Sequence, residues 1–355
     1  MSSVTIIGNY PELVRQRTGL YSLDWAFSSK GNLGVPMRTI LELYGYTNSG
    51  KSTLAYYLAG VLTGKGHVAL CDLEAADLEY IKTALDKSGL NGSVYITDVV
   101  DEKGKFIPHE EMLQSLSGKL REEDTGVAIL DSVGGIIPVA EAKNDFGEAN
   151  MGRRAKLVAQ VARAFNANLR VKERPSLAIV INHVHSIIGG RGHVTAGGES
   201  LKYLAASRVM IWPSERFTQG DDGSEFPIGF LVSGKLEKLR YGGPGREFQY
   251  YIVPGYGVHV GATAMFDCFN LGIAKRDTTV KLDGKSMGYL KKDFLDYAHE
   301  GKDRKFDPFI EALKIHEDSM RLKLMDEVEH EVEDKGNGYD EVTEVKTRKA
   351  RTKKD

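Results

Sequence analysis

The segment GYTNSGKST, from Gly45 to Thr53, has the residue types and spacing of a phosphate-binding loop. Glycines at positions 45 and 50 permit a tight turn that directs backbone N–H groups toward phosphate oxygens. The Lys51 ammonium is expected to reach the β- and γ-phosphates of a nucleotide, and the Ser52 hydroxyl to ligate Mg²⁺. A chance match in a glycine-rich turn is the alternative. The predicted ligands are a nucleotide and Mg²⁺, and the predicted contacts are Gly45, Tyr46, Thr47, Asn48, Ser49, Gly50, Lys51, Ser52 and Thr53.

Two acidic side chains follow apolar runs in positions that suit nucleotide hydrolysis. Asp131 lies near the end of GVAILDS, where a carboxylate can hold magnesium through water; a simple helix cap is the alternative. Glu74 ends HVALCDLE and is the candidate general base that activates the attacking water. Asp72 is the alternative base, because it precedes Glu74 by two positions on the same expected strand and its side chain would point the same way.

These residues need a scaffold, and the chain predicts alternating strands and helices. Apolar runs indicate strands over residues 39–45, 67–74, 93–99, 126–132 and 176–182, and periodic patterns indicate helices over 52–64, 77–89, 109–123 and 152–170. This alternation is typical of a parallel sheet with helices on both faces. Strand-like runs after residue 208, separated by turn signals, predict antiparallel additions at the sheet edge. The predicted fold is therefore α/β with a mainly parallel central sheet.

Bulk properties limit the classes of protein that this chain can represent. Its 355 residues, with 41% hydrophobic and 27% charged content, suit one large domain with appendages or two domains. A net charge of −2 provides no global basic field, so contacts with nucleic acid must come from local loops or patches. Two cysteines exclude a disulfide framework. No apolar run approaches the roughly 20 residues of a membrane span, and no signal-peptide pattern is present, so a cytoplasmic location without membrane contact is expected.

Several spaced motifs together resemble the RecA/UvsX family of strand-exchange recombinases. They are GVPMRTILELYGYTNSGKSTL, CDLEAADLEYIKTAL, the long stretch from VAILDSVGG to MGRRAKLVAQVARAFNANL, and LAIVINHVHSIIGGRGHVTAGGESLKYLAASRVMI. The resemblance covers about residues 17–272. It implies a RecA-like P-loop ATPase core over residues 19–261, preceded by an N-terminal oligomerisation segment over 1–18. A C-terminal subdomain over 262–334 and a disordered charged tail over 335–355 are expected to follow.

The resemblance also implies two DNA-binding loops, over residues 141–151 and 185–198. Arg153 and Arg154, after the first loop, are candidate phosphate contacts, and a solvated helix start is the alternative. The second loop contains five glycines, whose backbone N–H groups can cradle phosphates, and apolar side chains that can wedge between bases. A merely flexible surface loop is the alternative. Its candidate DNA contacts are Ile187, Ile188, Arg191, Val194, Gly197 and Gly198.

Four further residues receive roles from the resemblance. Tyr80 is placed to stack on adenine, and a tyrosine at the edge of the core is the alternative. His183 stands where bacterial RecA has a glutamine that senses the γ-phosphate; the preceding Asn and this His look like the phage-type protein UvsX, and a structural histidine is the alternative. Lys238 and Arg240 alternate on one strand face and are expected to complete the ATP site of a neighbouring subunit. Lys235 in another register, or an ordinary exposed strand face, is the alternative.

The resemblance implies an ATP-dependent homologous recombination protein and DNA-dependent ATPase. It would form helical filaments on single-stranded DNA, with ATP at the subunit interface, and exchange strands with double-stranded DNA. A ring-forming helicase or a recombination mediator of the same superfamily is the alternative, and a nucleotide-gated structural protein is a third. The tail changes from acidic to basic, and it either recruits a single-strand-binding protein or mediator or only aids solubility. If the protein is phage-encoded, the expected location is the host-cell cytoplasm.

Overall fold

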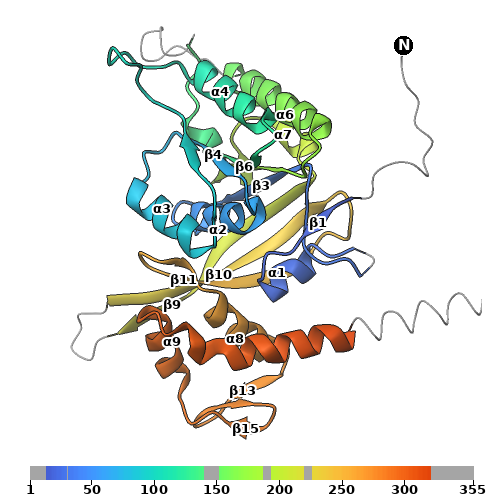
Figure 1. Ribbon diagram of the computed structural model, residues 1–355, viewed down its shortest axis with the longest axis vertical. Helices are drawn as coiled ribbons and strands as arrows, with labels where there is room; N and C mark the ends of the chain where they lie inside the picture. The colour runs from blue at the N-terminus through green and yellow to red at the C-terminus, as the bar shows by residue number, and fades with distance from the viewer. Residues whose placement is uncertain (1–12, 30, 140–151, 187–192, 220–225, 321–355) are drawn as a thin grey trace, which may run out of the picture. The chain divides into compact units, whose positions relative to one another are not determined.

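The computed structural model describes residues 13–29, 31–139, 152–186, 193–219 and 226–320 (Figure 1). Its central sheet has ten strands in the order β12-β11-β10-β9-β3-β7-β6-β4-β5, with β8 paired to β7. The parallel strands are β3 Thr39–Gly45, β4 His67–Asp72, β5 Val94–Ile96, β6 Thr125–Asp131, β7 Leu177–Ser186 and β9 Ser207–Gln219. The antiparallel additions are β10 Phe226–Leu239, β11 Glu247–Val253 and β12 Gly257–Val258. The predicted α/β fold, with a mainly parallel sheet and an antiparallel edge, is confirmed.

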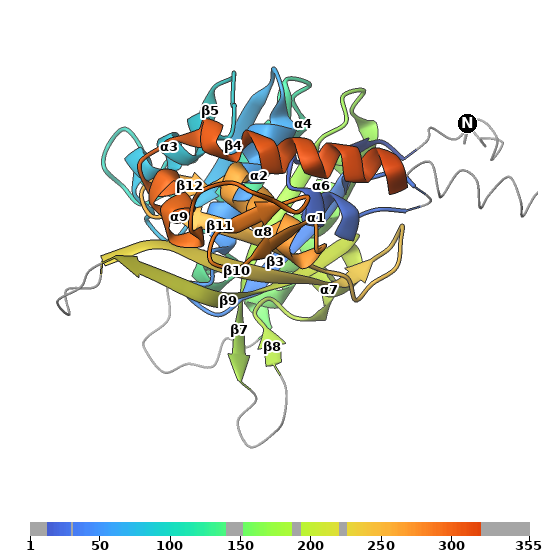
Figure 2. The same ribbon diagram turned by 90° about the horizontal axis from the view of Figure 1, so that it is seen from below.

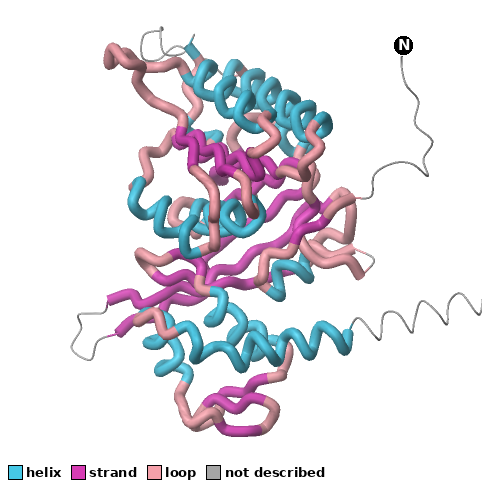
Figure 3. The backbone as a smooth tube through the Cα atoms, in the orientation of Figure 1, coloured by secondary structure: helices cyan, strands magenta, loops and turns pink. Residues whose placement is uncertain are grey.

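Helices cover both faces of the parallel strands, as the wholly apolar strands predict (Figures 1 and 3). Side chains of β3 alternate between two cores: Leu41 and Leu43 pack with α2 and α3, whereas Ile40 packs in the core that contains Leu201 of α7. The helices on the first face are α2 Lys51–Thr63 and α3 Leu78–Lys87. Those on the second face are α4 His109–Arg121, α6 Arg153–Val171 and α7 Glu199–Leu204.

The sequence near the N-terminus forms small elements beside the antiparallel strands. Helix α1 spans Tyr21–Ala26, and strands β1 Arg15–Gln16 and β2 Val35–Pro36 pair with each other. Asp24 is completely buried and accepts hydrogen bonds from the Thr18 backbone and hydroxyl, both at 2.8 Å. Neither α1 nor α7 was expected, because both are only six residues long and show too few turns for a periodic pattern.

The chain after β12 forms a third apolar core, which packs on β10 and β11 through Leu231, Tyr251 and Val253. Its elements are α8 Val260–Asn270, β13 Ala274–Arg276, β14 Val280–Leu282, β15 Lys285–Ser286, α9 Lys291–His299 and the 3-10 helix η3 Asp303–Phe306. Residues 1–313 belong to one compact unit and residues 314–355 to a second. No helix in the described part of the chain is both long and apolar enough to cross a membrane.

Candidate functional site

The predicted nucleotide-binding residues meet at the carboxyl edge of the parallel sheet. In the strand register, Gly45 at the end of β3 lies beside His183 of β7 and Ile211 of β9. Asp72, which ends β4, lies beside Asp131, which ends β6. Ligands of open α/β sheets bind outside the carboxyl ends of the strands, so this edge is where a ligand site is expected.

The loop between β3 and α2 has a tight, left-handed backbone at two positions. Asn48 has a φ of 59° and Gly50, the residue before α2, has a φ of 86°. At Gly45 a Cβ would lie 2.2 Å from the carbonyl oxygen of Ile211, so no side chain fits between the loop and β9. Tyr46, Thr47 and Asn48 are exposed, and Ser49 is buried. The loop therefore has the compact shape that the phosphate-binding interpretation requires.

The Lys51 ammonium is held by the loop itself. Its Nζ lies 2.6 Å from the carbonyl oxygen of Tyr46 and 3.3 Å from Oγ of Ser49, and the residue is buried. No ion pair of Lys51 occurs among the described residues. Burial lowers the pKa of Lys51, although the charges of Asp131 and Glu74 act in the opposite direction. A buried cation that contacts only neutral acceptors is well suited to receive a phosphate anion.

Asp131 has the environment of a metal-binding carboxylate. Its Oδ2 accepts a hydrogen bond from the Tyr56 hydroxyl at 3.3 Å, and its Oδ1 is buried without a hydrogen-bond partner among the residues that the structure describes. Burial, with the nearby charges of Glu74 and Asp72, raises the pKa of Asp131 to about 6, against the lowering effect of the Ser52 and Tyr56 hydroxyls.

The Asp131 carboxylate and the Ser52 hydroxyl fit a magnesium ion that takes its other ligands from phosphate and water. Within the described ranges there is no cluster of three or more His, Cys, Asp or Glu side chains that could hold a metal without such help. The nucleotide would therefore have to bring most of the coordination sphere, and the magnesium role of Ser52 and Asp131 stays a prediction.

Glu74 accepts hydrogen bonds from two of its neighbours through the same oxygen atom. The His183 Nε2 lies 2.8 Å from Glu74 Oε1, and the Ser132 hydroxyl donates to Oε1 as well. Burial would raise the pKa of Glu74, but the hydrogen bonds from Ser132 and His183 and the charges of His183 and Lys51 outweigh it, so the pKa is lowered. Glu74 is thus kept as the carboxylate that a general base must be. The contact with Ser132 was not foreseen, although the Asp-Ser-Val motif contains this residue.

Asp72 has a different environment, and one expectation about it is wrong. Strand β4 ends at Asp72, so Glu74 does not continue the strand and the alternation rule does not relate the two side chains. Instead, the Asp72 carboxylate accepts the backbone N–H groups of Glu74 at 3.0 Å and Ala76 at 2.7 Å. Ala75 has a φ of 55° within this turn. Asp72 therefore shapes the turn that presents Glu74, and its oxygens are already engaged.

Tyr80 of α3 lies against the first turns of α2. Its hydroxyl is 2.8 Å from Oγ1 of Thr53, and its ring meets that of Tyr56 edge to face. It is partly buried and packs against the core on this face of the sheet. This position agrees with the core-edge alternative and places the ring beside the phosphate-binding loop, so stacking on adenine stays a prediction.

The structure describes the residues that follow the first predicted DNA loop and part of the second loop. Arg153 and Arg154 begin α6, directly after Gly152. Strands β7 and β8, the latter His193–Thr195, leave the sheet side by side (Figure 2). Val194 is exposed, and Gly197 and Gly198 have φ values of 83° and 74°. A Cβ on Gly197 would lie 2.7 Å from Cγ1 of Val133, just after Asp131 and Ser132. Ile187, Ile188, Arg191 and the loop over 141–151 lie outside the described residues.

Lys238 and Arg240 lie on the same face of the chain, as their alternation predicts. The Nζ of Lys238 and the Nη2 of Arg240 both donate to the carbonyl oxygen of Tyr203, at 3.0 and 2.8 Å. Lys235, the alternative, pairs with Glu247 at 3.3 Å. In the strand register, Lys238 of β10 lies beside Arg208 of β9, which lies beside Glu42 of β3. Glu42 precedes Gly45 by three positions. The two cations therefore lie toward the opposite edge of the sheet from the phosphate-binding loop of their own chain.

A buried polar group connects β3, β7 and β9 and was not foreseen from the sequence. Glu42 and Asn182 are both fully buried. The Asn182 Nδ2 donates to Glu42 Oε1 and to the carbonyl oxygen of Ala196, both at 2.9 Å. The Arg208 Nε donates to the other Glu42 oxygen. A charged residue inside an apolar strand, LELYG, was the available signal, since buried carboxylates require partners.

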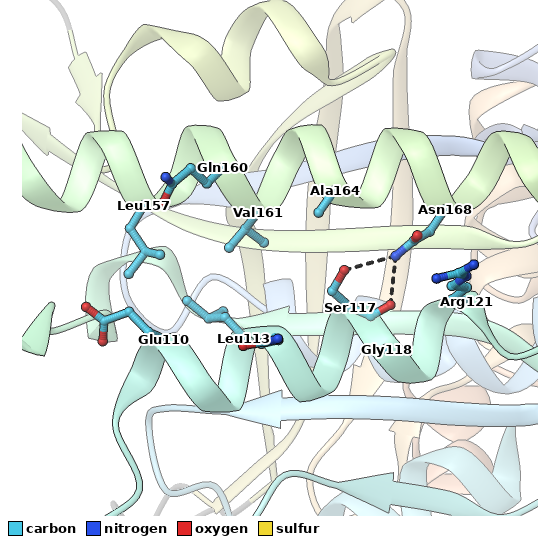
Figure 4. A pocket seen from close by; sticks show the side chains of 11 residues that line it. Glu110, Leu113, Ser117, Gly118, Arg121, Leu157, Gln160, Val161, Ala164 and Asn168 are labelled. Carbon is cyan, nitrogen blue, oxygen red and sulfur yellow. Dashed lines mark hydrogen bonds between the residues drawn. The ribbon is translucent and has the colours of Figure 1, made fainter.

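A separate groove lies between α4 and α6, away from the residues predicted from sequence (Figure 4). Leu113, Val161 and Ala164 form its apolar part, and the Asn168 amide donates to the carbonyl oxygen and hydroxyl of Ser117 at 2.8 and 2.9 Å. None of the predicted nucleotide or DNA contacts lines this groove. It is therefore no part of the candidate site.

The fold and the loop between β3 and α2 define a P-loop protein of the α/β class. A family model described as the RecA N-terminal domain matches residues 9–259, and the chain belongs to this family. Protein RecA of Mannheimia haemolytica is 32% identical over 247 residues, which span 68% of this chain but only 62% of that protein. Protein RecA of Geobacter sulfurreducens is 30% identical over 253 residues, 70% of this chain and 69% of that protein. The crystal structure of the RadB recombinase has 19% identity and a TM-score of 0.47, covering 68% of this chain and 97% of that chain.

Proposed function

We propose that this protein is an ATP-dependent homologous recombination protein that forms filaments on single-stranded DNA and promotes pairing and strand exchange with a homologous duplex. The contact between Glu74 and His183 carries the proposal. Glu74 lies at the nucleotide site, whereas His183 lies on β7, which leads into the second predicted DNA loop. A hydrogen bond between them gives the nucleotide site and the loop one shared contact, whose loss or gain can bias both.

The residues at the carboxyl edge divide the work of hydrolysis. Lys51 and the loop from Gly45 to Gly50 hold the phosphates, and Ser52 and Asp131 hold the metal side of the nucleotide. Bound Mg²⁺ would neutralise phosphate charge. Glu74 orients the attacking water and accepts its proton. His183 competes for the same Glu74 oxygen, so the position of His183 decides whether the base is available.

The DNA path uses the entrances of the two loops. Arg153 and Arg154 occupy the first turn of α6, directly after the first predicted loop, and are proposed to contact DNA phosphates. Val194 and the backbone of Gly197 and Gly198 lie at the end of the second loop, and Ile187, Ile188 and Arg191 of the same loop are proposed as further contacts. These contacts bind the backbone and the base faces, so homology is read by base pairing.

The filament interface is proposed to use Lys238 and Arg240 as contacts to ATP held by a neighbour. Residues 4–8, VTIIG, are proposed to add as a strand to the edge of a neighbouring sheet. Among the described strands β5 pairs only with β4, and Tyr95 and Ile96 of β5 are exposed, which gives such a strand an apolar edge to join. The tail over 335–355 is proposed to recruit a single-strand-binding protein or mediator.

The test is ATP hydrolysis with and without single-stranded DNA, combined with negative-stain imaging in the presence of a non-hydrolysable ATP analogue. The proposal requires stimulation of hydrolysis by DNA and helical filaments whose formation depends on nucleotide. Closed rings on DNA would instead identify a helicase or mediator of the same superfamily. Equal hydrolysis with and without DNA, and no assembly, would overturn the proposal.

A further inference from the structure

Helix α7 ends at the basic pair Lys238 and Arg240. The Lys238 Nζ donates to the carbonyl oxygens of Lys202 at 2.6 Å and Tyr203 at 3.0 Å, and the Arg240 Nη2 donates to that of Tyr203 at 2.8 Å. The last carbonyls of a helix lack partners within the helix and carry partial negative charge, so cations stabilise them. Lys238 of β10 and Arg240, just after the end of β10, therefore form the carboxyl-terminal cap of α7.

The other end of α7 continues directly from the second loop. The Ala196 carbonyl accepts the Asn182 amide at 2.9 Å, and Gly197 and Gly198 join this point to Glu199, the first residue of α7. Leu201 is buried in the core on this face. Residues 196–204 thus form one short connection, held by Asn182 next to the loop and by the basic pair at the far end.

The basic pair has too little reach to serve the nucleotide site of its own chain. Lys238 is level with Glu42, and Gly45 lies three residues further along β3, which is about 10 Å at the usual rise of a strand. Strand β9 separates β10 from β3 and adds further distance. Among the described residues, the carbonyls of α7 are the acceptors that both cations contact, and a phosphate at this surface would have to come from another molecule.

We propose that the α7 carbonyls and a phosphate of the nucleotide bound by a second copy of this chain compete for Lys238 and Arg240. When the neighbour binds nucleotide, the cap leaves α7, and the arm of the second loop over residues 193–198 is loosened. This inference rests on the proposed function, because it requires contact between copies. It assigns the basic pair a second role, which is to report the neighbour's nucleotide state to the DNA loop of its own chain.

The chemistry of the two acceptors favours exchange. Hydrogen bonds from a cation to an anionic phosphate oxygen are shorter and about twice as strong as those to a neutral acceptor. The pKa of Lys238 is lowered, first by burial and then by the positive charges of Arg240 and Arg208. The negative charge of Glu42 acts in the opposite direction. A phosphate would relieve that repulsion, which the α7 carbonyls do only in part.

Hydrogen–deuterium exchange on the full-length protein tests whether Lys238 and Arg240 leave the α7 carbonyls when nucleotide binds. In the wild type without nucleotide, amides 203–206 at the end of α7 should be protected. The double variant Lys238→Ala, Arg240→Ala should exchange there about tenfold faster, whereas Lys235→Ala, on the same strand but paired with Glu247, should match the wild type. A non-hydrolysable ATP analogue should accelerate exchange of residues 193–206 in the wild type under assembly conditions and leave the double variant unchanged.

The outcomes separate this inference from the proposed function. Without nucleotide, unchanged exchange in a folded double variant would show that the basic pair does not cap α7, and this comparison needs no assembly. If filaments form with nucleotide while α7 stays protected in the wild type, the basic pair does not leave α7 and this inference is refuted. The proposed function, which requires the filament, would still stand. If the double variant fails to fold, the single variant Lys238→Ala removes two of the three bonds and retains Arg240, and it must still raise exchange at α7.

Discussion

The Nε2 atom of His183 lies 2.8 Å from Oε1 of Glu74, which joins two residues 109 positions apart in the sequence. Glu74 follows β4 and His183 lies near the end of β7, with β6 between them in the sheet. The Ser132 hydroxyl, from the turn after β6, reaches the same Glu74 oxygen. The candidate base is therefore fixed by groups from two neighbouring strand ends, one of which leads to the second predicted DNA loop.

Replacement of His183 should separate hydrolysis from its control by DNA. His183→Gln keeps a side chain that can donate to Glu74, so DNA should still stimulate hydrolysis. His183→Ala removes the donor, and stimulation should fall at least tenfold, whereas KM for ATP should change by no more than about fivefold, because the neutral hydrogen bond that His183 could make to the γ-phosphate contributes about 1 kcal/mol. Steady-state kinetics with and without single-stranded DNA measure both effects. Equal stimulation in the two variants would show that His183 has no part in the coupling.

Glu74→Gln should abolish hydrolysis and retain nucleotide binding. Loss of a general base typically lowers kcat by about 10²–10⁴-fold, and the amide keeps the size of the side chain. Asp72→Asn is the control. It should lower thermal stability, because Asp72 holds two backbone N–H groups, and reduce kcat much less. Single-turnover hydrolysis and equilibrium binding of a fluorescent ATP analogue give the two quantities. A larger loss of kcat in Asp72→Asn than in Glu74→Gln would identify Asp72 as the base.

Asp131 should make the stability of the nucleotide-free protein depend on pH. Its pKa is raised from 3.8 to about 6 in the folded state, so the folded protein holds this proton more tightly than the unfolded chain. The buried charge therefore lowers stability progressively between about pH 4 and pH 6, by about 2–3 kcal/mol. Asp131→Asn removes this loss, so its stability relative to the wild type should be greater at pH 8 than at pH 4.

Urea denaturation of the wild type and the Asp131→Asn variant at the two pH values measures this difference. The same carboxylate must be ionised to serve magnesium, so magnesium-dependent nucleotide binding should weaken as the pH falls below about 6. A stability difference that does not change with pH would contradict the raised pKa of Asp131.

Gly197→Ala should destabilise the junction between the second loop and α7. The residue has a φ of 83°, and a Cβ would lie 2.7 Å from Val133, so we expect a loss of about 1–3 kcal/mol in the free energy of unfolding. Gly118→Ala is the matched control, because Gly118 lies inside α4 with open space around its Cβ position and should gain up to about 1 kcal/mol. Urea denaturation compares them. Equal stability of the two variants would show that the strained glycine is not needed.

The sequence predicted the positions of β3, β4, β5, β6 and β7, because each is a short apolar run, but β9, which was expected among the antiparallel additions, pairs parallel to β3. The run over 39–45 matches β3 residue for residue, and the helix over 52–64 matches α2 to within one position. The motifs also located Glu74, Asp131 and His183, which the structure brings together at one edge of the sheet. Parallel strands end at the same edge of a sheet, so residues that follow different strands lie close together even when they are far apart in the sequence.

The rest depended on tertiary contacts that leave no periodic signal. Strand β4 stops at Asp72 because its carboxylate binds the next backbone N–H groups, which no alternation pattern reveals. Helix α7 has six residues and takes its cap from Lys238 in β10 and from Arg240 just after β10, far along the chain. The pairing of Asn182 with Glu42 required the register of β3 and β7, which sequence patterns alone do not supply.

The central claim is that ATP gates homologous pairing, and the formation of joint molecules tests it most directly. Circular single-stranded DNA and a homologous linear duplex are incubated with ATP and either the wild type, Lys51→Ala or the control Lys65→Ala, an exposed lysine just beyond α2. We predict joint molecules with the wild type and the control, none with a heterologous duplex, and at least a hundredfold loss with Lys51→Ala. Full pairing by Lys51→Ala, or no homology-dependent joint molecules with the wild type, would contradict the account.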